Sequence, residues 1–124
     1  MFIQENVNPL KNDTGDCVIR AISVVEGKDW DDVFLDLRIE AFTRKLMIED
    51  NRLWMEYLHR IGYERYNIPD TCPDCYLVGD FVRDNPTGKF IVGTGTHLIA
   101  VVSGTLIDTW DSRGKVALFY FRKE

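Results

Sequence analysis

Apolar residues in the first half of the chain recur at helical spacing in three segments. Residues 18–25 are apolar at so many positions that they predict a helix buried nearly all round, beginning near Cys17. Gly27 can adopt the left-handed backbone with which helices commonly end. Residues 30–42 and 50–61 each place apolar side chains three and four positions apart, which predicts two amphipathic helices. We therefore expect three consecutive helices after an extended lead-in.

The pattern changes to that of β-strands near residue 89. β-Branched and apolar residues gather in short runs, and Ser103-Gly104 is typical of a tight hairpin turn. Residues 76–84 fit either period, and we favour a short helix there. The expected strands are residues 63–68, 89–92, 97–102, 105–110 and 116–122. Helices followed by antiparallel strands predict an α+β fold, with N-terminal helices packed on a C-terminal antiparallel β-sheet.

Length and composition indicate one globular domain spanning residues 1–124. A net charge of −5 without a basic run argues against a protein that binds nucleic acid by neutralising phosphates. No apolar stretch approaches the length of a membrane span, and the N-terminus lacks the layout of a signal peptide. Three cysteines are a poor disulfide framework. We expect a cytoplasmic protein with reduced thiols that binds neither nucleic acid nor membrane.

Cys17 is the first candidate for chemistry. It would sit in the first turn of a buried helix, where unpaired backbone N–H groups and the positive end of the helix dipole favour a thiolate. The alternative is a small buried cysteine in a core helix, since free cysteine is among the most buried residue types.

His97 and Asp108 are predicted to meet across the hairpin. If Ser103 and Gly104 form the turn, Ile99 faces Asp108 and His97 faces Trp110, so His97 and Asp108 are diagonal neighbours on one face. A carboxylate there can orient the imidazole while its other nitrogen faces a nucleophile.

Two further residues complete this prediction. Asp111 has the opposite parity and replaces Asp108 as orienter only if the turn has another length or a bulge intervenes. His59, the second histidine, lies late in an amphipathic helix and is expected on the solvated surface.

A resemblance to a known family rests on four parts of the chain: Gly15-Asp16-Cys17-Val18-Ile19-Arg20-Ala21, Gly95–Val102, Gly104 and Asp108-Thr109-Trp110-Asp111. Their order resembles the papain-like cysteine peptidase fold. It looks closest to minimal bacterial and phage versions, such as bacteriocin-processing peptidase domains and small cell-wall cysteine hydrolases. The resemblance implies Cys17 as nucleophile, His97 as general base and then acid, and Asp108 as orienter. We expect no cofactor and no metal.

The oxyanion site departs from the family pattern. The family commonly has a glutamine a few residues before the cysteine, and Gln4 lies too far upstream to match that spacing. Asn12 is the best substitute, because its side-chain amide can donate a hydrogen bond alongside the Cys17 backbone N–H.

The expected function is thiol-dependent acyl transfer on an amide, isopeptide or thioester, with hydrolysis of a peptide or protein substrate as the leading case. A rival from another class is a non-enzymatic binding or inhibitor module on the same scaffold, such as a phage or mobile-element protein that acts on a host partner. A third hypothesis concerns Cys72 and Cys75. This CxxC pair is interpreted first as two loop cysteines and second as a redox or metal site.

Overall fold

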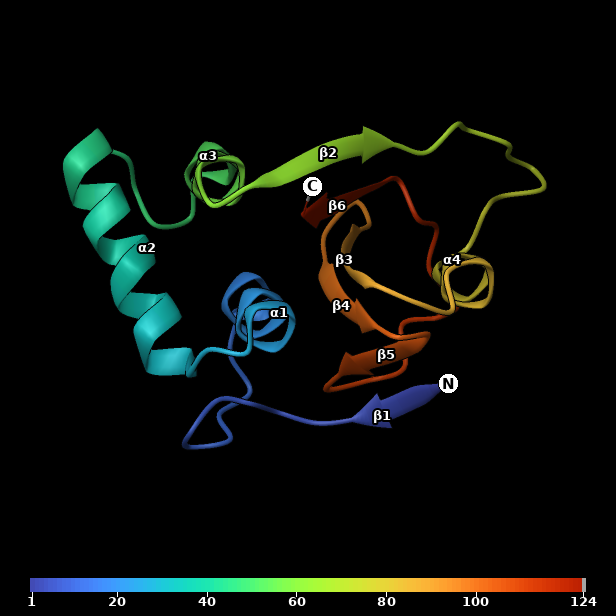
Figure 1. The fold of residues 1–124 in the computed structure, drawn as a ribbon, viewed down its shortest axis with the longest axis horizontal. Coiled ribbons are helices and arrows are strands. Elements are labelled where there is room, and N and C mark those ends of the chain that lie inside the picture. Colours follow the sequence, from blue (N-terminus) through green and yellow to red (C-terminus); the bar gives the residue numbers. More distant parts are fainter. Residues whose placement is uncertain (124) are drawn as a thin grey trace.

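The computed structural model describes residues 1–123 and has the predicted α+β character. Figure 1 shows a central sheet with α1, α2 and α3 on one side and α4 on the other. The helices are α1 (Cys17–Glu26), α2 (Trp30–Arg44), α3 (Asn51–Arg60) and α4 (Val78–Asp84). The strands are β1 (Phe2–Gln4), β2 (Tyr63–Asn67), β3 (Lys89–Gly93), β4 (Leu98–Val102), β5 (Thr105–Asp108) and β6 (Phe119–Lys123).

The six strands form one sheet in the order β1-β5-β4-β3-β6-β2. Every neighbouring pair is antiparallel except β1 and β5, which are parallel, with Gln4 opposite Asp108. The expectation of a purely antiparallel sheet is therefore wrong at one edge. Residues 2–4 form a strand because they pair with the otherwise open edge of β5, although three residues are too few to show a strand pattern in the sequence.

The sheet has a hydrophobic core on each face, which explains why β3 and β4 are almost continuously apolar. Alternate residues point to opposite sides. One core joins the sheet to α1, α2 and α3, and Ile91 and Ala100 belong to it. The other joins the sheet to α4, and Val92 and Ile99 belong to it.

Most predicted elements are confirmed, with shifted ends. The first helix ends at Gly27 in a left-handed conformation, and residues 76–84 contain the short helix α4. The turn at Ser103-Gly104 is confirmed, since both residues have positive φ and Val102 pairs with Thr105. β4 begins one residue after His97 and β5 ends at Asp108, so both site residues lie at strand ends.

Cys72 and Cys75 form a disulfide in the loop between β2 and α4, contrary to the expectation of reduced thiols. A spacing of two residues lets the pair close a local loop, which the odd cysteine count does not reveal. Cys17 is the free cysteine. Within residues 1–123, no helix has the length and apolar character needed to cross a bilayer.

Candidate active site

Cys17 is the first residue of α1, and the residue before it is held from several sides. The buried Asp16 carboxylate accepts hydrogen bonds from the Trp30 indole at 2.9 Å and the Asn8 amide at 3.3 Å. It also forms an ion pair with Arg20, one turn further along α1. These contacts fix the path of the chain into α1 and so fix the position of Cys17.

His97 and Asp108 are joined by a hydrogen bond of 2.6 Å between Nε2 and Oδ2. Both side chains are largely buried, with exposed fractions of 11% and 2%. The hairpin register Val101↔Leu106 and Ala100↔Ile107 continues toward these residues as the turn predicts. The predicted meeting of His97 and Asp108 across the hairpin is confirmed.

Three other groups hold Asp108 in place. Its Oδ1 accepts from the Thr109 backbone N–H at 2.7 Å, and its Oδ2 lies 3.4 Å from the buried Ser112 hydroxyl. Arg20 lies 3.6 Å from Oδ1, so one guanidinium contacts both Asp16 and Asp108. The carboxylate is therefore held in the orientation that reaches His97.

The thiol and the imidazole are coupled. Burial raises the pKa of the Cys17 thiol, but hydrogen bonds from His97 and the Leu98 backbone, with the charges of His97 and Arg20, lower this pKa below its ordinary value. Burial lowers the pKa of His97, but hydrogen bonds to Asp108 and Cys17 and their charges raise this pKa to about 9. Because Asp108 occupies Nε2, the other ring nitrogen is left for the thiol. Both shifts favour the thiolate–imidazolium pair over the neutral pair.

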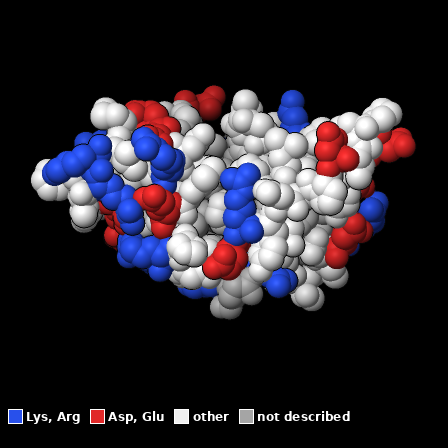
Figure 2. Space-filling view, turned by 90° about the horizontal axis from the view of Figure 1, so that it is seen from above, with Lys and Arg blue, Asp and Glu red and all other residues white. Residues whose placement is uncertain are grey.

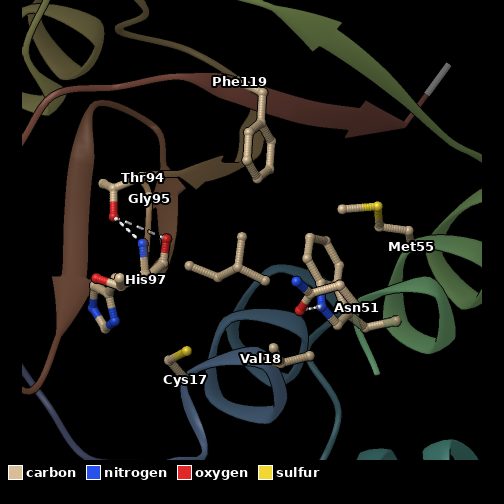
Figure 3. Close-up of a pocket in the computed structure, with 11 residues that line it drawn as sticks. Cys17, Val18, Asn51, Met55, Thr94, Gly95, His97 and Phe119 are labelled. Carbon is tan, nitrogen blue, oxygen red and sulfur yellow. Dashed lines mark hydrogen bonds between the residues drawn. The ribbon is translucent and has the colours of Figure 1, made fainter. Parts of the chain in front are cut away.

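The pair borders a small cavity of about 210 Å³, drawn in Figure 3. Among the described residues that line it, Cys17 and His97 are ionisable and the others are apolar or neutral. The lining residues are Cys17, Val18, Asn51, Trp54, Met55, Thr94, Gly95, Thr96, His97, Leu98 and Phe119. In Figure 3, Phe119, Met55 and Val18 surround the hollow while Cys17 and His97 lie together at one side. A reacting group entering this cavity would meet the sulfur.

Asn12 is not brought into this cavity. It is exposed, its backbone carbonyl accepts from the Asn6 side chain at 3.1 Å, and it is absent from the lining. Gln4 lies in β1 and is also exposed. The donor that α1 itself offers is the Cys17 N–H, since the first N–H groups of a helix have no partner within it. An oxyanion role for Asn12 stays a prediction.

The structure also shows what Asp111 and His59 contact. Asp111 forms a two-pronged pair with Arg113, at 2.9 and 2.7 Å, rather than contacting His97. His59 is 74% exposed beside Glu64, as expected for a surface residue. Among residues 1–123, no group of three His, Cys, Asp or Glu side chains is arranged to hold a metal ion.

The sequence did not identify Arg20, Ser112 and Trp30 as residues that support the site. An acidic residue four positions before an arginine on a helix is a signal for an ion pair, and Asp16 and Arg20 have that spacing. Nothing in the sequence indicates that the same guanidinium also reaches the end of β5.

Comparison of the chain with protein-family models, curated proteins and solved structures found no match.

Proposed function

We propose that this chain is a cysteine hydrolase that performs thiol-dependent acyl transfer on an amide, isopeptide or thioester. One observation carries the proposal: His97 is hydrogen-bonded to Asp108 and lies with Cys17 at one side of a cavity that the sulfur borders. A nucleophile, a base within reach and a third group that orients the base make up the arrangement that covalent catalysis needs. Peptide hydrolysis on a papain-like scaffold is the leading case.

The first half of the reaction forms an acyl-enzyme. The Cys17 thiolate attacks the substrate carbonyl, a C–S bond forms, and the carbonyl electron pair moves to oxygen. The Cys17 N–H donates to this oxyanion. The oxyanion then collapses, the bond to the leaving group breaks, and the His97 imidazolium protonates the departing nitrogen or sulfur.

The second half returns the enzyme to its starting state. Neutral His97 takes a proton from water as the oxygen attacks the thioester carbonyl. Collapse releases the carboxylic acid product and breaks the C–S bond. The thiolate and imidazolium are then restored, with Asp108 holding the ring in one orientation throughout.

The rival function is a binding or inhibitor module that keeps the scaffold without turnover. The exposed position of Asn12 favours it, because the predicted second oxyanion donor then lies outside the cavity lining. This rival predicts no acyl-enzyme.

The test uses p-nitrophenyl acetate as a generic acyl donor, with nitrophenolate release and intact mass as readouts. Wild type should acetylate at Cys17 and turn over. Cys17→Ala should do neither, and Asp108→Ala should lose turnover about a hundredfold or more because the imidazole loses its orienting acceptor.

Asp111→Ala is the matched control, since Asp111 is an exposed aspartate of the same segment that contacts Arg113 instead. Equal turnover in wild type and Cys17→Ala would overturn the proposal, as would full turnover in Asp108→Ala.

A further inference from the structure

The outer face of α2 carries an apolar stripe that the fold does not use. Leu35, Ile39 and Phe42 follow each other at spacings of four and three, so they share one face of the helix. Their exposed fractions are 56%, 64% and 74%. The opposite face of α2 supplies Val33 and Leu37 to the core. The apolar spacing of residues 30–42 predicted one buried face that ended at Phe42, and the structure shows that Phe42 is exposed instead.

The stripe is accessible over its whole length. α2 is the outermost element on its side of the molecule in Figure 1. Arg38, which lies between the stripe residues in sequence, directs its guanidinium over the Phe34 ring at 5.4 Å. Contiguous exposed apolar surface on a helix marks a contact site more often than single exposed residues do.

The charges beside the stripe differ between its two ends. Asp31 and Asp32 lie in the first turn of α2, and Lys45 follows its last residue. The Lys45 ammonium lies 4.0 Å over the Phe42 ring, at the edge of the stripe. Within residues 1–123, none of these three charges belongs to an ion pair. In Figure 2, Lys and Arg side chains gather at the left of the view, the side on which α2 lies.

We propose that this stripe is the contact by which two copies of the chain form a symmetric dimer, with the two α2 helices packed antiparallel. In such a pair, residues equally far from the midpoint between Arg38 and Ile39 face each other. Leu35 then packs against Phe42 of the second copy. A two-fold contact uses the same surface on both copies, so it must be complementary to itself.

The end charges satisfy this requirement. The antiparallel arrangement brings Asp32 of one copy beside Lys45 of the other, and the reverse contact occurs at the opposite end. It also opposes the two helix dipoles. A parallel arrangement would instead bring the two acidic ends together. One helix per copy is a small interface, so we expect an association in the micromolar range or weaker.

The first test is sedimentation of the full chain up to millimolar concentration. Wild type should dimerise, and Phe42→Glu should weaken the dimer tenfold or more by placing a charge in the stripe. Leu10→Glu is the matched control, because Leu10 is an equally exposed apolar residue (79%) outside α2. Wild type that stays monomeric at millimolar concentration overturns the proposal, and so does a dimer that Phe42→Glu leaves intact.

A charge exchange tests the antiparallel arrangement separately from folding. Asp32→Lys alone and Lys45→Asp alone should each weaken self-association, since like charges then meet at both ends. An equimolar mixture of the two variants should dimerise as well as wild type, because both contacts are again between opposite charges. A mixture that remains as weak as the single variants contradicts the arrangement.

Discussion

At the scale of single residues, Arg20 is the contact that joins the nucleophile helix to the orienting carboxylate. Its guanidinium pairs with Asp16 beside Cys17 and lies 3.6 Å from Asp108 beside His97. Its side chain is 12% exposed, so solvent screens these charges little. Arg20 also contributes to the lowered pKa of the Cys17 thiol.

Arg20→Gln should therefore slow alkylation of Cys17 at neutral pH, by up to about tenfold if the thiol pKa rises by one unit. It should also destabilise the protein by about 3 kcal/mol, because two buried carboxylates lose their cation. The measurements are the pH profile of iodoacetamide labelling and urea unfolding. Arg113→Gln is the control, since Arg113 pairs with an exposed aspartate and should change neither. An unchanged Cys17 profile in Arg20→Gln would remove Arg20 from this role.

The sequence predicted His97 and Asp108 together because a two-residue turn sets the register of a hairpin, and register decides which side chains share a face. Arg20 could not be found in this way. Its contact with Asp108 depends on how α1 packs against the end of β5, and packing between elements leaves no periodic trace in the sequence.

At the scale of elements, the wall of the cavity depends on a close approach between β3 and β6. The Phe119 ring lies so near Gly93 that a Cβ at that position would be 2.1 Å from it. Phe119 lines the cavity and is also packed against the core beneath α1 and α3. Gly93 is thus what allows the ring to occupy this place.

Gly93→Ala should destabilise the protein by about 1–3 kcal/mol and displace the Phe119 ring, because the added methyl group overlaps it. Gly95→Ala is the matched control, since a Cβ there has nothing within 4 Å. The measurement is urea unfolding of both variants. Adding Phe119→Leu should recover part of the loss in Gly93→Ala. Equal stability of the two alanine variants would disprove the close approach.

The helices and the hairpin could be predicted because each carries its own signal: apolar spacing, Gly27 at a helix end, and Ser103-Gly104 at a turn. β1 could not be predicted, since a three-residue strand takes its structure from the edge of β5. The outward direction of Phe42 could not be predicted either. α2 is apolar on two faces, and spacing alone does not show which face meets the core.

At the scale of the whole molecule, the His97–Asp108 contact links stability to pH. The pKa of His97 is raised from 6.5 to about 9 in the folded chain. A group whose pKa is raised on folding contributes its full stabilisation at pH values below its pKa in the unfolded chain, which is near 6.5 for histidine. This contribution is lost as the pH rises through the pKa of the group in the folded chain. Cys17 has a lowered pKa, and its contribution changes in the opposite direction over much of this range.

Removing the thiol should therefore expose the histidine contribution. In Cys17→Ala, the free energy of unfolding should fall as pH rises above 6.5, because Asp108 still holds the imidazolium. Cys17→Ala/His97→Ala should lack this fall. Urea unfolding at a series of pH values measures both, and parallel curves would show that His97 is not protonated preferentially in the folded state.

The α+β class and the single site were predictable for the whole chain because helices precede strands and the chemistry-bearing residues lie at element ends. The packing of helices against both faces of the sheet was harder to predict. The apolar runs of β3 and β4 indicate burial on both faces, yet only the position of α4 shows what covers the second face.

The most direct test of the account is the pH dependence of Cys17 alkylation by iodoacetamide, mapped by mass spectrometry in wild type and His97→Ala. Wild-type Cys17 should react well below the ordinary thiol pKa of about 8.5, and His97→Ala should shift the profile up toward that value. Identical profiles in the two proteins, or a wild-type thiol that titrates like a free cysteine, would contradict the Cys17–His97 pair and the hydrolase proposal with it.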